Sequence, residues 1–107
     1  MDLTLVYRAL AEGQVDVAAG DATAGLIDAL NLSVLDDDRQ YFPPYDAVPV
    51  VHSPTLLRHP EIGAAIERLS GRVTGEVMRR MNYAVDARRL DPAVVVSAFL
   101  DSLDRGV

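Results

Sequence analysis

The segment RQYFPPYDAVPVV, residues 39–51, constrains the fold more than any other part of the chain. Pro43, Pro44 and Pro49 each fix φ near −65° and lack a backbone N–H, so a regular helix cannot run through them. Pro49 also cannot donate to a sheet ladder, which makes residues 47–51 an extended edge or crossover strand rather than a central one. The segment therefore separates a first part with short extended runs from a second part with helical patterning.

Upstream of this segment, the sequence predicts two helices and two short strands. The first helix carries an apolar stripe at helical spacing, formed by Leu3, Val6, Tyr7 and Leu10. Gly13 follows as a stop signal. The runs VDVA (15–18) and LSVL (32–35) predict strands, and either Asp21 or Thr23 is placed to cap the helix between them.

Downstream of residue 53, the pattern predicts helices only. One stripe consists of Ile62, Ala65, Ile66 and Leu69. Thr74 is placed to cap the next helix, and Asp91-Pro92 forms an N-cap followed by proline at the first helical position. The fold class is therefore α/β, with three short strands and a helical C-terminal half. Such a thin sheet predicts a part of a larger fold, or one that a partner chain completes.

Composition and charge exclude several functions. The chain of 107 residues has a formal net charge of −6, which argues against nucleic acid as a partner, although all ten basic residues are arginine. Cysteine is absent, so the chain has no disulfide, thiol nucleophile or cysteine-ligated zinc. The sequence has no apolar run of the length that a membrane span requires, and no signal-peptide pattern.

The polar residues suggest no catalytic or metal site. The serines lack a glycine-flanked nucleophile elbow. His52 and His59 have no third ligand at a metal spacing, and the triplet Asp36–Asp38 lacks the alternating ligand pattern of a calcium loop. The arginine pairs 79–80 and 88–89 are typical of solvated helix faces. We therefore expect neither an enzyme nor a cofactor.

The aromatic residues of the proline segment leave two interpretations open. Tyr41, Phe42 and Tyr45 lie among prolines that restrict the backbone. Their rings could pack over the adjoining helices, which the residues alone favour. Alternatively, the negative face of an aromatic ring attracts a cation that cannot donate a hydrogen bond, such as a quaternary ammonium group.

Five blocks, in order along the chain, resemble one protein family. These blocks are YRALAEGQVDV (7–17), VLDDDRQYFPPYDAVPVV (34–51), HPEI (59–62), LSGRVTGEVMRRMNYAVD (69–86) and DPAVVVSAFL (91–100). Together they resemble the C-terminal part of the substrate-binding proteins of glycine betaine/choline (osmoprotectant) ABC importers, along nearly the full length of the chain.

The resemblance implies a partial type II periplasmic-binding-protein fold, in which two α/β lobes trap a ligand. Residues 1–38 would form the end of the second lobe plus the return crossover strand, and residues 39–107 the C-terminal part of the first lobe. The expected function is that of a fragment of the ligand-binding component of an importer for solutes such as glycine betaine, choline or carnitine. The implied partners are this solute and a membrane permease, and the implied location is periplasmic or extracytoplasmic.

Three ligand-binding residues follow from the resemblance. Tyr45 occupies the position of a tyrosine that, in the family, forms one wall of an aromatic cage around the trimethylammonium group. A second cage tyrosine lies in a turn after the VDV strand, and here Asp21 takes its place while Thr23 matches the family pattern. We expect Asp21 either to attract a cation by charge or to accept a hydrogen bond.

Two other functions are compatible with these features. Because of Asp21, the ligand could be a different cationic or zwitterionic small molecule. The chain could instead be a self-associating structural module, forming a homodimer in which uncovered or exchanged elements cover one another.

Overall fold

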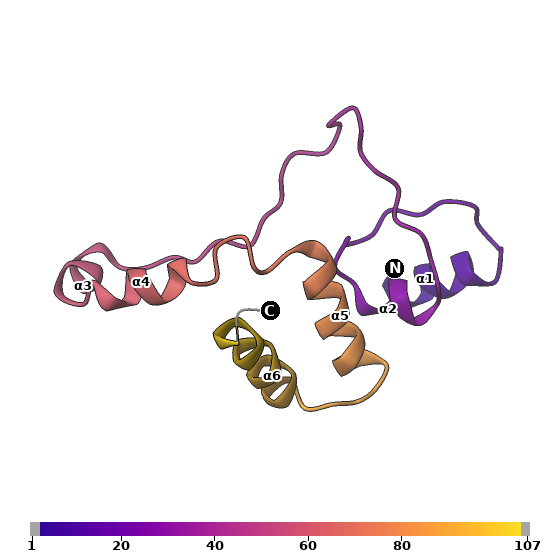
Figure 1. Ribbon diagram of the computed structural model, residues 1–107. Helices are drawn as coiled ribbons and strands as arrows, with labels where there is room; N and C mark the ends of the chain where they lie inside the picture. Colours follow the sequence, from indigo (N-terminus) through magenta and orange to yellow (C-terminus); the bar gives the residue numbers. More distant parts are fainter. Residues whose placement is uncertain (1–2, 106–107) are drawn as a thin grey trace. The chain divides into compact units, whose positions relative to one another are not determined.

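The computed structural model describes residues 3–105 and contains six α-helices within them (Figure 1). In chain order these are α1 (Leu3–Ala11), α2 (Gly25–Ala29), α3 (Ser53–Arg58), α4 (Glu61–Glu67), α5 (Gly75–Asp86) and α6 (Pro92–Asp104). None of the helices in this range combines the length and apolar character needed to cross a membrane.

The helices belong to two compact units. One unit joins the chain up to Val34 with the chain from Gly75 onward and contains α1, α2, α5 and α6. The other comprises Leu35–Thr74 and contains α3 and α4. These two units are defined by contacts between residues. The assignment of residues 1–38 and 39–107 to two lobes of a larger fold stays a prediction.

The core of the first unit lies where α2 packs on α5. Ile27 of α2 and Tyr7 of α1 are buried, with 8% and 6% of their surface exposed. Gly25, the first residue of α2, is also buried, and a Cβ there would lie 2.6 Å from the backbone of both Asn82 and Tyr83. The absence of a side chain at residue 25 therefore lets the two helices approach closely.

Two predicted helix ends of this unit are confirmed. Gly13 adopts a φ of 70°, and the N–H groups of Gly13 and Gln14 donate to the carbonyls of Leu10 and Ala9, at 3.1 and 2.8 Å. This pattern is a Schellman ending, which glycine favours because it has no Cβ to clash. At the start of α6, the Asp91 carboxylate accepts from Ala93 N–H at 2.7 Å, with Pro92 at the first helical position.

The predicted cap of α2 is wrong. Its N-cap is Ala24, which makes no side-chain capping bond. Asp21 and Thr23 lie earlier, in a turn closed by the Ala24 N–H, which donates to the Asp21 carbonyl at 3.1 Å. The turn delays the helix start beyond the reach of either side chain.

The second unit is built around a helix break at a proline. The chain leaves α3 at His59, and Pro60 is the N-cap of α4. The His59 ring nitrogen Nδ1 lies 3.0 Å from a Glu61 carboxylate oxygen. Neither α3 nor α4 contains a buried residue, and α4 ends at Glu67, short of the apolar stripe that continues to Leu69.

The three predicted strands are not formed within residues 3–105. Residues 15–18, 32–35 and 47–51 lie in irregular structure, so the α/β class is not confirmed by the described residues. Val17 is 70% exposed and Val50 is 90% exposed. A strand is stable only when a neighbouring strand accepts and donates its backbone hydrogen bonds, and these segments have no such neighbour within the described part of the chain.

Candidate functional site

Tyr45 lies fully at the surface of the proline segment. Its exposed fraction is 98%, the largest among the exposed large apolar and aromatic residues of the described chain. Pro43 and Pro44 precede it directly and restrict the backbone on that side. The ring is therefore free for a ligand or for another part of a larger protein.

Tyr41 and Phe42 contact one another instead of a helix. Their ring centroids are 5.2 Å apart with the planes at 85°, an edge-to-face pair. They remain 82% and 66% exposed, so the prediction that the rings pack over the adjoining helices is wrong for the described structure. The segment carries all three rings as part of the long connection between α2 and α3 (Figure 1).

Asp37 organises the start of this segment. Its carboxylate oxygens accept hydrogen bonds from the N–H groups of Tyr41 and Phe42, at 2.9 and 2.8 Å. The Phe42 N–H and then the Tyr41 N–H lower the pKa of the Asp37 carboxyl, because both bonds favour its charged form. Gln40 completes the turn with a φ of 51° and an N–H that donates to the Asp37 carbonyl.

Within the aspartate triplet, Asp37 therefore stabilises a local turn through hydrogen bonds to the backbone that follows it. The predicted strand 32–35, which directly precedes the triplet, is not formed in the described residues. The described residues also contain no group of three or more histidine, aspartate or glutamate side chains placed to hold a metal ion.

Asp21 and Thr23 lie together in the turn before α2, the segment 20–24, which side chains from two other helices hold in place. The Asp21 N–H donates to the Tyr7 hydroxyl at 3.1 Å. The Thr23 carbonyl accepts from Asn82 Nδ2 at 2.7 Å, and the Ala22 carbonyl from Arg79 Nη1 at 2.9 Å. The backbone of this turn is thereby tied to α1 and α5.

The side chains of Asp21 and Thr23, in contrast to the backbone of the turn, have no partner among the described residues. Asp21 is exposed and Thr23 half-buried, and within residues 3–105 neither the carboxylate nor the hydroxyl makes a hydrogen bond. The structure brings Asp21 and Thr23 together in one unit. Tyr45 belongs to the other unit.

Sequence reasoning missed the residues that hold the turn. Tyr7 was predicted only as part of an apolar stripe, and Arg79 as part of a solvated face. The Arg79 side chain is 22% exposed, whereas the neighbouring Arg80 side chain is 65% exposed and pairs with Glu76, as a solvated residue would. A usable signal was Asn82, because an amide on the same helix as the apolar residues Val77, Met78 and Met81 needs a hydrogen-bond partner if it is buried with them.

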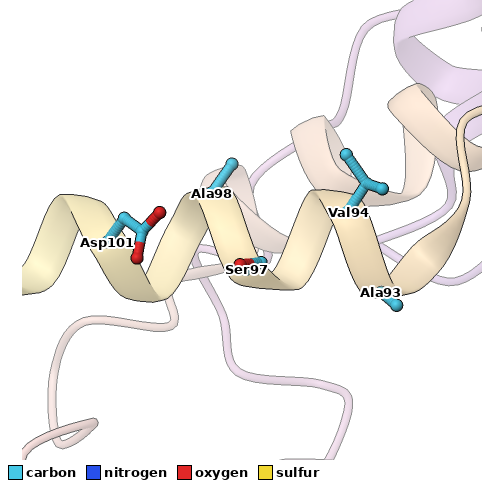
Figure 2. Close-up of a pocket in the computed structure, with 5 residues that line it drawn as sticks. All are labelled: Ala93, Val94, Ser97, Ala98 and Asp101. Atoms are coloured by element: carbon cyan, nitrogen blue, oxygen red, sulfur yellow. The ribbon is translucent and has the colours of Figure 1, made fainter.

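The α6 surface offers a shallow groove that does not resemble a ligand site. Figure 2 shows its lining residues, which all come from α6: Ala93, Val94, Ser97, Ala98 and Asp101. A small-molecule site usually combines an enclosed apolar cavity with converging polar groups from several elements. This groove is open and one-sided, so the turn 20–24 and Tyr45 are the stronger candidates.

Three known proteins that resemble this chain are named as binding proteins for small solutes. A carnitine transport binding protein of Listeria monocytogenes is 40% identical over 94% of this chain, and a glycine-betaine-binding protein of Pseudomonas aeruginosa is 38% identical over 94%. An ergothioneine transport permease/ergothioneine binding protein of Helicobacter pylori is 30% identical over 96%. The chain spans 32% of the first two proteins and 19% of the third.

A solved structure and a family description agree with these relatives. The crystal structure of a glycine betaine/carnitine/choline ABC transporter is 43% identical, with a TM-score of 0.88 over 95% of this chain and 37% of that chain. Residues 1–102 match the family described as the substrate binding domain of the ABC-type glycine betaine transport system. This chain therefore belongs to the family of substrate-binding domains of ABC-type glycine betaine transport systems.

Proposed function

We propose that this chain forms part of a solute-binding component of an ABC importer for quaternary-ammonium solutes such as glycine betaine, choline or carnitine. The observation that carries the proposal is Tyr45, an aromatic ring 98% exposed beside two prolines, in a chain that belongs to this family. A ring that packs on nothing in its own unit keeps its whole face for a cation, and cation–π contacts suit an ammonium group without N–H donors.

The same proposal covers the larger protein. There the chain contributes to a type II α/β binding-protein fold. The unpaired runs 15–18, 32–35 and 47–51 become strands when other segments of that fold lie beside them. The protein acts outside the cytoplasm, delivers its solute to a membrane permease and catalyses no reaction.

Asp21 and Thr23 supply polar contacts to the solute. The Asp21 carboxylate attracts the positive charge, and the Thr23 hydroxyl can both donate and accept a hydrogen bond. A carboxylate also accepts hydrogen bonds from N–H groups, so a cationic or zwitterionic solute with such donors is the alternative ligand at the same site.

Calorimetry on a hybrid protein tests this proposal. In the hybrid, this chain replaces the aligned third of the Listeria carnitine transport binding protein, and glycine betaine, choline and carnitine are titrated separately. We expect at least one to bind, and Tyr45→Ala to weaken that binding by about twofold to thirtyfold through loss of the cation–π contact, worth about 0.5–2 kcal/mol. Tyr45→Phe keeps the aromatic face and should bind nearly as well.

Tyr41→Ala is the matched control, because Tyr41 is also an exposed tyrosine of the same segment. Its removal should leave the affinity unchanged. Equal losses for Tyr41→Ala and Tyr45→Ala would contradict the assignment of Tyr45. A hybrid that folds, as judged by circular dichroism, but binds none of the three solutes would contradict the function itself.

A second candidate function is self-association, which the exposed apolar runs favour. Val17, Leu35, Val48 and Val50 are each at least 70% exposed. A homodimer in which these runs pair between two copies would cover them. Light scattering over a range of concentrations tests this, and a monomer at every concentration, with cooperative unfolding, would exclude it.

A further inference from the structure

We infer that Tyr7, Arg79 and Asn82 are positioning residues, which fix the backbone of the turn 20–24 and so hold the Asp21 and Thr23 side chains in place for the solute. The inference rests on the proposed function, since it assumes that the turn binds the solute. It concerns residues on α1 and α5 that do not themselves contact the solute.

The first support is that backbone groups of three consecutive turn residues bond to side chains of α1 and α5. Asp21 N–H, Ala22 C=O and Thr23 C=O each have a different side-chain partner, at 3.1, 2.9 and 2.7 Å. The Tyr7 hydroxyl lies 3.5 Å from the Asp21 carbonyl as well, and that carbonyl also accepts from Ala24 N–H. Three consecutive residues are thus held through their main chain, independently of what their side chains are.

The second support is the environment of Arg79. Its Nη1 donates to the Ala22 carbonyl, while Nε lies 3.6 Å from an Asp28 carboxylate oxygen, close enough for attraction between charges but too far for a hydrogen bond. Asp28 belongs to α2. One guanidinium on α5 therefore contacts both the turn and the helix that follows it, which fixes their relative geometry.

The third support is the close approach at both ends of the turn. A Cβ at Gly20 would collide with the Tyr7 ring, and a Cβ at Gly25 would collide with the α5 backbone. The hydrogen bonds above require this closeness, since their donors extend from α1 and α5. The two glycines and the three side chains together make one rigid support.

Nuclear magnetic resonance on the 107-residue chain tests the support itself. Tyr7→Phe removes one hydroxyl, and Asn82→Asp replaces the donor amide with a carboxylate of nearly the same shape. We expect the amide hydrogens of Asp21 and Ala24, whose N–H groups donate hydrogen bonds in this turn, to exchange about twofold to tenfold faster in each variant, as the loss of one hydrogen bond predicts. The amides of α6 serve as an internal reference, and Arg80→Ala on the exposed side of α5 as the control variant.

Solute binding by the hybrid protein tests the purpose of the support. Asn82→Asp should weaken binding about twofold to tenfold, and combining it with Asp21→Asn should weaken binding by less than the product of the two effects, since both act through one turn. Arg80→Ala and Asp21→Asn should combine as independent changes. A purely structural role of Asn82 would lower the melting temperature without such coupling.

Four results would overturn the inference. Unchanged exchange of the Asp21 and Ala24 amides in both variants would show that the side chains do not hold the turn. If the losses of affinity caused by Asn82→Asp and Asp21→Asn simply multiplied in the double variant, the turn would not be positioned for the solute. The same conclusion would follow if Asp21→Asn had no effect on affinity. In either case, weaker binding by Tyr45→Ala would still support the proposed function. Failure of the hybrid to bind any of the three solutes would remove the proposed function, and the role of the turn with it.

Discussion

Asp37 illustrates how one exposed side chain can direct a longer segment. Its carboxylate accepts hydrogen bonds from two backbone N–H groups just before Pro43-Pro44. These bonds set the direction of the chain at the start of the proline segment. Because the residue is fully exposed, this is a local effect on the turn rather than a large contribution to global stability.

The lowered pKa of Asp37 predicts a pH dependence of this turn. A carboxyl with a lowered pKa in the folded chain stabilises the turn fully above its ordinary pKa and loses this effect as the pH falls through the lowered value. We expect the Asp37 carboxyl carbon to titrate at lower pH in the folded chain than in the urea-unfolded chain, as measured by nuclear magnetic resonance. The amide signals of Tyr41 and Phe42 should shift with the same midpoint.

Asp37→Asn serves as the control for that titration. Without an ionisable group at residue 37, the amide signals of Tyr41 and Phe42 should no longer follow the low-pH midpoint. Identical midpoints for Asp37 in the folded and unfolded chains would contradict the two hydrogen bonds as the cause.

Single residues were predictable from the sequence where their role is local. Gly13 as a stop and Asp91 as a cap follow from short-range rules, because each acts on a backbone group within four residues of itself. Asn82 and Arg79 act on residues 59 and 57 positions away. No pattern within one helix reveals such a partner, so these roles needed the folded structure.

Among the elements, the contact between α2 and α5 depends on the missing side chain of Gly25. Gly25→Ala should lower the free energy of unfolding by about 1–3 kcal/mol, the usual effect of forcing atoms into a packed contact, here against the backbone of Asn82 and Tyr83. Urea denaturation followed by circular dichroism measures this.

Gly75 provides a matched control, since it is the first residue of α5 as Gly25 is of α2. A Cβ at Gly75 meets nothing within 4 Å. Gly75→Ala should therefore leave stability unchanged or raise it by about 0.5–1 kcal/mol, because alanine favours the helix. The same loss in both variants would show that the close approach of α2 and α5 is not the reason.

The start of α6 allows a second test at this scale. Asp91→Ala removes the acceptor for the Ala93 N–H and should lower the free energy of unfolding by about 0.5–2 kcal/mol. Asp91→Asn keeps an acceptor oxygen and should retain most of the stability. If Asp91→Asn were as unstable as Asp91→Ala, charge rather than capping would explain the effect.

The predicted strands failed for a reason that belongs to elements. A helix makes its hydrogen bonds within itself, so α1, α5 and α6 could be predicted from their own residues. A strand requires a neighbour, and the β-branched runs 15–18, 32–35 and 47–51 have none in the described chain. Their β-branched composition favours a strand only in a fold where a neighbouring strand is present.

For the whole molecule, the two units should differ in local stability. The first unit contains buried Tyr7, Gly25 and Ile27, whereas α3 and α4 contain no buried residue. Hydrogen exchange measured by mass spectrometry should therefore show faster exchange in α3 and α4 than in α2 and α5, since opening costs less where little apolar surface is buried.

Gly25→Ala makes this comparison specific. The substitution should accelerate exchange in α2 and α5 and leave α3 and α4 unchanged, because only the first unit contains the altered contact. Equal acceleration in all four helices would indicate that the chain opens as one cooperative unit.

The support of the turn 20–24 also has a kinetic consequence. Ordering the backbone of one residue costs about 1–2 kcal/mol in conformational entropy. Because Tyr7, Arg79 and Asn82 already hold residues 21–23, the chain loses that freedom when it folds and not when a solute arrives. Under the proposed function, a solute that binds this turn meets a backbone that is already ordered, so no loop-ordering step slows its association.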